Sequence, residues 1–258
     1  MHFRIQIKNA TIVNEGRKFL GTLVIDDDRI EEILEGMDAT PSIPVDETID
    51  GTDCYILPGV IDDHVHFRDP GLTAKGDFCS ESRAAAAGGV TTVFDMPNCV
   101  PQTTTKEAFD EKWQIAANKS VVNYGFFFGA TAGNAYELSK LNPRKVAGIK
   151  LFMGSSTGNM LVNDERALRA IFENAKLPIM AHCENSSLID ENMKAAQAQY
   201  GADPDVRHHP EIRSEEACYA STSLAIRLAQ EAGARLHVAH ISTARELELF
   251  TADDPNIT

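Results

Sequence analysis

The sequence predicts an α/β fold in which a parallel β-sheet with helical connections follows a smaller β-rich segment. From Cys54 onward, apolar runs of strand length alternate with helical patterns, and repeated strand–helix units of this kind build parallel sheets. The strand candidates are nearly continuous in apolar residues, for example across residues 91–96, which is typical of strands buried on both faces. The change of pattern divides the chain into two expected domains, residues 1–56 and residues 57–258.

Residues 1–56 carry the shorter, alternating runs. Apolar positions alternate through residues 5–13, and further runs follow at 20–25 and 30–34, with turn signals such as Asn14-Glu15-Gly16 between them. Short alternating runs separated by turns predict a small antiparallel sheet. Residues 41–53 are polar and contain two prolines, so we expect them to form a linker.

The strands of the larger domain are expected at 55–66, 90–96, 121–129, 146–153, 178–183 and 235–241. Helices are expected at 77–88, 105–118, 134–141 and 163–175, and within 186–233, which is interrupted at 201–204 and near 209–210. A closed eight-stranded barrel usually takes ~250 residues, more than remain here. The strand pattern alone therefore fits either an open sheet or a barrel without its last two units. No glycine-rich nucleotide-binding motif follows any of these strands, which disfavours the nucleotide-binding open sheets.

Charge, apolar runs and cysteines indicate which partners and which cellular compartment to expect. The formal net charge is −14, which argues against nucleic acid or an anionic membrane as the main partner. No apolar run approaches the ~20 residues that span a bilayer, and the N-terminus has no signal-peptide core. The five cysteines are scattered without a CxxC pair, so we expect reduced thiols in a cytoplasmic protein.

His64 and His66 stand two residues apart near the end of the first of these strands. Alternate residues of a strand face the same side, so both imidazoles can reach one metal ion, and imidazole is a good ligand for Zn²⁺. Two incidental histidines on a half-exposed strand would have the same spacing. The pair alone therefore indicates a metal site only weakly.

Three further residues strengthen that interpretation. His182 and His240 end two other strands, and in a β/α barrel all strand C-termini open to one mouth. Lys150 lies inside an apolar strand, where a charged ammonium is costly. Its neutral amine could react with CO₂ to form a carbamate that bridges two metals, although a lysine extending to the barrel rim would fit the same position. This constellation favours the barrel over the open sheet.

The segment Pro58-Gly-Val-Ile-Asp-Asp-His-Val-His-Phe-Arg-Asp-Pro-Gly71, with Asp95-Met-Pro-Asn98, closely resembles the dihydroorotases of the amidohydrolase superfamily. The resemblance extends from about residue 3 to the C-terminus. It implies a metal-dependent (β/α)8 TIM-type barrel beside a small β-sandwich to which residues 1–56 contribute. It also implies the reversible cyclisation of N-carbamoyl-L-aspartate to L-dihydroorotate in pyrimidine biosynthesis, through a metal-bound hydroxide.

The resemblance also implies roles for individual residues. His64 and His66 would bind the more buried of two Zn²⁺ ions, carbamylated Lys150 would bridge the ions, and His182 and His240 would bind the second. Arg68 and Asn98 match positions that hold the substrate carboxylate, which suits a guanidinium fork and an amide donor. A salt bridge from Arg68 to Asp69, and a turn role for Asn98 after Pro97, are the structural alternatives.

One expected residue has no counterpart in this chain. Relatives use an aspartate at the end of the eighth strand as the proton shuttle, whereas Asp253 and Asp254 lie in a polar tail. Together with the strand count, this predicts a barrel truncated after about six βα units, the N-terminal portion of a longer enzyme. We expect the 258-residue chain alone to be inactive and poorly soluble, because open sheet edges would be exposed.

Other functions share the same metal chemistry. Hydantoinases or dihydropyrimidinases and allantoinases act on cyclic ureides, and a substrate carboxylate that would explain Arg68 and Asn98 favours dihydroorotate over them. A non-catalytic scaffold that associates with aspartate transcarbamoylase is the alternative of another class. The expected partners are a small-molecule substrate and, beyond it, a second copy of the chain or a transcarbamoylase, with no nucleic acid and no membrane.

Overall fold

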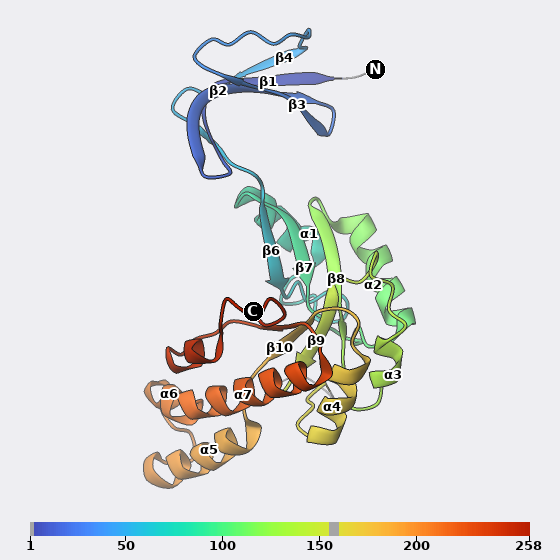
Figure 1. Ribbon diagram of the computed structural model, residues 1–258, viewed down its shortest axis with the longest axis vertical. Helices are drawn as coiled ribbons and strands as arrows, with labels where there is room; N and C mark the ends of the chain where they lie inside the picture. Colours follow the sequence, from blue (N-terminus) through green and yellow to red (C-terminus); the bar gives the residue numbers. More distant parts are fainter. Residues whose placement is uncertain (1–2, 155–159) are drawn as a thin grey trace. The chain divides into compact units, whose positions relative to one another are not determined.

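The computed structural model describes residues 3–154 and 160–258, and the chain divides into two compact units, Met1–Val60 and Ile61–Thr258 (Figure 1). The sequence analysis placed the boundary between residues 56 and 57. Each unit has its own sheet. No helix in the described part of the chain is both long enough and apolar enough to cross a membrane.

The first unit is one five-stranded sheet. Its strands are β1 (Arg4–Asn14), β2 (Arg17–Asp26), β3 (Arg29–Glu35), β4 (Glu47–Asp50) and β5 (Tyr55–Ile56). The pairs β1–β2 and β2–β3 are antiparallel, as expected, with Ile7 opposite Leu23 in register. Both β4 and β5 pair with β1 in parallel, so the sheet is mixed rather than antiparallel.

Two boundaries of the sequence analysis were wrong. Part of the expected linker forms β4, a strand of four exposed residues too short to show an alternating pattern. The expected strand 55–66 is two strands, because β5 belongs to the first sheet and β6 (Val60–Val65) belongs to the second. The break falls at Leu57-Pro58-Gly59, where Pro58 cannot donate a ladder hydrogen bond.

The second unit contains a parallel sheet whose strand order is β11-β10-β9-β8-β7-β6. The strands after β6 are β7 (Val90–Asp95), β8 (Asn123–Gly129), β9 (Gly148–Phe152), β10 (Ile179–His182) and β11 (Leu236–Val238). Each strand lies beside its sequence neighbour, without the reversal of order that defines a doubly wound sheet. This sequential winding is that of a β/α barrel, so the six strands form an arc of a barrel.

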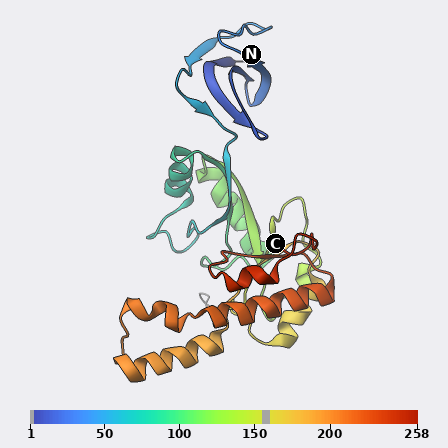
Figure 2. The same ribbon diagram turned by 60° about the vertical axis from the view of Figure 1, so that its left-hand side comes forward.

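Helices connect these strands: α1 (Phe78–Ala87), α2 (Lys106–Lys119), α3 (Ala135–Leu138), α4 (Glu165–Asn174), α5 (Ser186–Tyr200), α6 (His209–Ile212) and α7 (Glu215–Ala232). Side chains cap most N-termini; Asp77, for example, accepts a hydrogen bond from the N–H of Ser80 at 2.8 Å. The long connection between β10 and β11 contains α5, α6 and α7, and α5 and α7 lie side by side (Figures 1 and 2).

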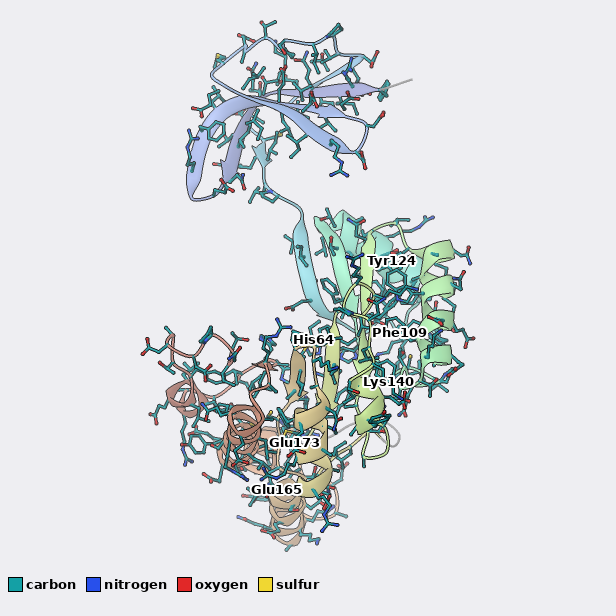
Figure 3. The ribbon with its side chains drawn as sticks, turned by 45° about the vertical axis from the view of Figure 1, so that its right-hand side comes forward. His64, Phe109, Tyr124, Lys140, Glu165 and Glu173 are labelled. Atoms are coloured by element: carbon teal, nitrogen blue, oxygen red, sulfur yellow. The ribbon has the colours of Figure 1, made fainter. Side chains whose placement is uncertain are left out.

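Aromatic side chains form much of the core between β8 and α2 (Figure 3). The ring of Phe109 on α2 lies 6.1 Å from that of Phe126, and Trp113 lies 5.0 Å from Tyr124. This packing attaches α2 to the outer face of the sheet.

Residues 256–258 lie along β11. The N–H of Leu236 donates to Asn256 and the N–H of Val238 donates to Thr258, both at 2.8 Å, and Leu236 forms a parallel bridge with Ile257. The expected polar tail thus continues the sheet in the same sequential order. From the sequence, residues 154–158 could form a substrate loop or a plain turn. Of these residues the structure describes only Gly154.

Candidate functional site

Five side chains with metal-ligand chemistry lie toward the C-terminal edge of the second sheet. His64 belongs to β6 (Figure 3), and His66 follows that strand. Lys150 lies in β9, His182 ends β10, and His240 follows β11 by two residues. His240 has a φ of +44°, a left-handed conformation that is uncommon outside glycine and is found at functional sites.

The imidazole rings converge although their strands are far apart in the sheet. The ring centroids of His64 and His66 are 5.4 Å apart, those of His64 and His240 are 5.3 Å apart, and those of His182 and His240 are 4.8 Å apart. In a flat sheet β6 and β11 would be separated by five strand spacings of about 4.8 Å, about 24 Å in all. The contact between His64 and His240 therefore requires a strongly curved sheet, as in a barrel.

Hydrogen bonds orient two of the imidazoles. Nδ1 of His66 lies 2.7 Å from Oδ1 of Asn98, and because that oxygen only accepts, Nδ1 carries the proton and Nε2 keeps its lone pair. Nε2 of His182 lies 2.6 Å from Oε2 of Glu184, which leaves the lone pair of His182 on Nδ1. That Nδ1 lies 3.0 Å from Nε2 of His240, so a cation between these two nitrogens could bind both.

Burial favours the neutral form of His64, His66 and His240. Burial, with repulsion from Lys150 and the other histidines, lowers the pKa of His64 to about 3. Burial also lowers the pKa values of His66 and His240, with Lys150 acting in the same direction on both. Neutral imidazole is the form that binds a metal.

Lys150 has a fully buried side chain, and its Nζ has no hydrogen-bond partner among the described residues. Burial lowers the pKa of its amine to about 8. An amine with a depressed pKa in a dry environment is available as a neutral nucleophile. An unsatisfied buried nitrogen of this kind needs an explanation, and a group bound at this position would supply one.

The candidate ligands are arranged in pairs. In the part of the chain that the structure describes, no three His, Cys, Asp or Glu side chains form a group able to hold a single metal ion. The four histidines instead form two pairs, His64 with His66 and His182 with His240, and Lys150 acts electrostatically on members of both pairs. Each pair could contribute two imidazoles to a metal ion.

Arg68 and Asn98 lie beside this cluster. Arg68 follows His66 by two residues in a left-handed conformation, with a φ of +67°, and its charge lowers the pKa of His66. The salt bridge to Asp69 that sequence allowed is not formed, because Asp69 pairs with Lys119 at 2.7 Å. Asn98 contacts His66 through Oδ1, so its Nδ2 is left to donate elsewhere.

Glu184 and Arg213 are two further residues of the site that were not predicted from the sequence. Nη1 of Arg213 lies 2.5 Å from Oε2 of Glu184, the oxygen that also holds His182. Burial alone would raise the pKa of Glu184, but the bonds from His182 and Arg213 lower it overall. The signal was available, since Glu184 stands two residues after His182 and so can face the same side.

A cavity of about 210 Å³ is lined by His182, Glu184 and Arg213, together with His209 and His240. His209 is exposed but borders this cavity, whereas the ring of His208 stacks on Tyr200 at 3.7 Å. Cys183 is buried, and burial raises the pKa of its thiol to about 12, as expected for an inert cysteine.

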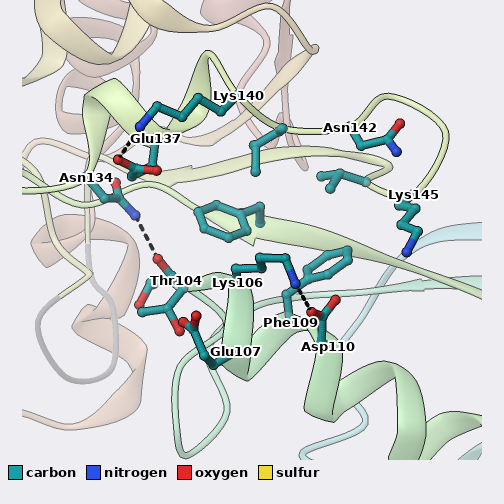
Figure 4. Close-up of a pocket in the computed structure, with 14 residues that line it drawn as sticks. Thr104, Lys106, Glu107, Phe109, Asp110, Asn134, Glu137, Lys140, Asn142 and Lys145 are labelled. Carbon is teal, nitrogen blue, oxygen red and sulfur yellow. Dashed lines mark hydrogen bonds and ion pairs between the residues drawn. The ribbon is translucent and has the colours of Figure 1, made fainter.

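A larger cavity, of about 680 Å³, lies between α2 and the segment around α3 (Figure 4). Its floor includes Phe109 and Phe128, and its charged residues largely neutralise one another, since Lys140 pairs with Glu137 at 2.9 Å and Lys106 pairs with Asp110. It contains no histidine or cysteine. This cavity is larger than the one beside His182, but the side chains with metal-ligand chemistry lie at the histidine cluster.

Comparison with known proteins agrees with this geometry. A family model described as dihydro-orotase-like matches residues 54–246. The chain is 35% identical over 229 residues to a dihydroorotase of Methanosphaera stadtmanae, covering 88% of this chain and 52% of that protein. It is also 35% identical over 257 residues to an allantoinase of Desulfitobacterium hafniense, covering 96% of this chain and 55% of that protein.

Among solved structures, an L-hydantoinase (dihydropyrimidinase) from Arthrobacter aurescens superposes with a TM-score of 0.87 at 28% identity, covering 96% of this chain and 55% of that one. The chain thus spans about half the length of the relatives that it matches. Because the family model covers most of the chain and the barrel arc bears the matching motif residues, the chain belongs to the dihydro-orotase-like family.

Proposed function

We propose that the complete protein is a metal-dependent cyclic amidohydrolase, and that its substrate pair is N-carbamoyl-L-aspartate and L-dihydroorotate. The convergence of four histidines near Lys150, a fully buried lysine whose Nζ has no hydrogen-bond partner among the described residues, carries this proposal. Membership of a family whose relatives bear the names dihydroorotase, allantoinase and hydantoinase supports the reaction class.

We assign His64 and His66 to one Zn²⁺ ion and His182 and His240 to the other. The neutral amine of Lys150 would form an N–C bond to CO₂ and release a proton, giving a carbamate with two oxygens to share between the ions. Its low pKa favours the neutral amine that this addition needs. When bound, such ions act as Lewis acids that polarise an amide carbonyl and lower the pKa of a water molecule.

The protein side chains have orienting roles in this proposal. Asn98 keeps the proton of His66 on Nδ1, and Glu184 keeps that of His182 on Nε2, so each ring presents its other nitrogen to an ion. Arg213 keeps Glu184 ionised. Arg68 would hold the substrate carboxylate as a fork, with the Nδ2 of Asn98 as a second donor.

The test is to assay the complete, zinc-loaded protein with dihydroorotate, dihydrouracil and allantoin side by side. We expect turnover of dihydroorotate to dominate, and Arg68→Met to lower its kcat/KM by roughly 10–150-fold, the value of a hydrogen bond to a charged group. Dihydrouracil has no carboxylate, so residual turnover of it should be insensitive to that change. Turnover of dihydrouracil or allantoin but not dihydroorotate would refute the substrate assignment.

A hydantoinase or dihydropyrimidinase activity is the second candidate, favoured by the superposition on the Arthrobacter enzyme. The same assay separates it, since an uncharged ring gives Arg68 no carboxylate to bind. Metal analysis of the complete protein addresses the non-catalytic scaffold: about two Zn²⁺ per chain supports the enzyme, and no metal with no turnover supports the scaffold.

A further inference from the structure

The hydrogen-bond ladder between β6 and β7 ends beside His66. The N–H of Met96 donates to the carbonyl of Val65 at 2.9 Å, as a rung of a parallel ladder. In such a ladder the next rung would run from the N–H of Phe67 to the carbonyl of Met96. That N–H instead donates to Oδ1 of Asp95 at 2.7 Å, and the carbonyl of Met96 accepts from Nζ of Lys112 at 2.8 Å.

A buried ion pair takes the place of the missing rung. Nζ of Lys112 lies 2.5 Å from Oδ2 of Asp95, and the two side chains are 0% and 1% exposed. The ammonium also lies 3.9 Å from Sγ of Cys99 and 5.1 Å from the centroid of the Phe126 ring. The two charges neutralise each other, and the N–H groups of Lys112 have acceptors within the protein. A buried ion pair requires both.

The residues on both sides of His66, Val65 and Phe67, are hydrogen-bonded to the end of β7. Two residues beyond Met96 stands Asn98, whose Oδ1 fixes the proton of His66. Within the pair, Asp95 binds the backbone of Phe67 and Lys112 binds the carbonyl of Met96. Met96 in turn donates to Val65, on the other side of His66, and leads to Asn98.

We propose that Lys112 and Asp95 are positioning residues, which set the orientation of His66 and Asn98 by replacing a rung of the β6–β7 ladder with a buried ion pair. The proposal rests on the proposed metal site, because its consequence is the affinity of that site. Neither residue contacts a reacting atom, and Lys112 acts from α2 through β7.

The experiment measures Zn²⁺ affinity of the complete protein by competition with a chromogenic chelator, and the visible spectrum after Co²⁺ substitution. Lys112→Met keeps a long, unbranched side chain but removes the ammonium, so the carbonyl of Met96 and the carboxylate of Asp95 lose their partner. We expect Zn²⁺ affinity to fall about 10–100-fold, as for other residues that orient metal ligands, with an altered Co²⁺ spectrum. Asp95→Asn keeps an acceptor for Phe67 and should give a smaller loss in the same direction.

Leu168→Ala is the matched control, since it destabilises the buried core from α4 without touching the ladder. It should lower Tm but leave affinity and spectrum unchanged. Equal affinities for Lys112→Met and Leu168→Ala would overturn the positioning role. If Lys112→Met does not fold, Asp95→Asn decides by the same comparison. Absence of Zn²⁺ binding in the unmodified protein would overturn the proposed function itself, a result distinct from a variant that binds normally.

Discussion

At the scale of single residues, the environment of Lys150 limits what its amine can do. It is fully buried, has no hydrogen-bond partner among the described residues, and has a pKa of about 8. We expect Lys150→Met, which preserves length and apolar packing, to reduce bound zinc in the complete protein from about two ions per chain to one or none. Elemental analysis measures this directly. The exposed Lys145→Met is the control, and undiminished zinc in Lys150→Met would contradict the bridging role.

His64 makes the metal-free protein sensitive to acid. Its pKa is about 3 in the folded chain and 6.5 in the unfolded chain, so the unfolded chain binds the proton first as pH falls. Stability should therefore decrease as pH falls from about 6.5 towards 3, and burial of His66 and His240 acts in the same direction.

The measurement is Tm of the chelator-treated complete protein at pH 7 and pH 5. The loss of Tm on acidification should be smaller in His64→Asn than in the unmodified protein. His208→Asn changes a histidine outside the cluster and should keep the full loss. The same pH response in both variants would exclude His64 as a source of the effect.

At the scale of elements, the packing of α2 on β8 depends on a few large rings. Phe109 is 4% exposed, and its ring lies 6.1 Å from Phe126 and 6.2 Å from Phe128. We expect Phe109→Ala to lower the free energy of unfolding by about 3–5 kcal/mol, since it removes buried contacts and leaves a cavity. Urea denaturation checks this. Glu111→Ala, on the exposed side of the same helix, should change stability by less than about 0.5 kcal/mol.

The sequence predicted β8, β9 and β10 because residues buried on both faces of these strands form continuous apolar runs. It could not separate β5 from β6, because only Pro58 and Gly59 mark the break. The four-residue β4 is exposed throughout, so no hydrophobic pattern identified it. The sequence also left barrel and open sheet undecided until chemistry was considered, whereas strand order decides between them directly.

The candidate ligands were predictable because histidine at several strand ends is unusual, and the resemblance added Arg68 and Asn98. Lys112 was not predictable in the same way. It lies in Lys106–Lys119, a helix with lysines at both ends, and only its contacts show that it is 0% exposed and paired with Asp95. Residues that act through others have no pattern of their own, since their position depends on packing between distant segments.

At the scale of the whole molecule, the proposed ligands come from both edges of the second sheet. His64 lies on β6 at one edge and His240 follows β11 at the other, with Lys150 on β9 and His182 on β10 between them. Metal binding at these residues would therefore oppose any flattening of the arc. A ligand that binds the folded form but not the unfolded chain stabilises the fold, and the stabilisation increases with the affinity.

We accordingly expect removal of metal to lower the Tm of the complete protein. At a free Zn²⁺ concentration of 100 times Kd, binding contributes about 2.7 kcal/mol, which corresponds to roughly 5–10 °C for a domain of this size. Scanning calorimetry with and without chelator measures the shift. His240→Ala should reduce it strongly, because one of the two histidine pairs then loses a member. His237→Gln, on β11 but bonded to Thr258 at 3.0 Å, should retain the shift. A shift unaffected by His240→Ala would place the stabilising metal elsewhere in the protein.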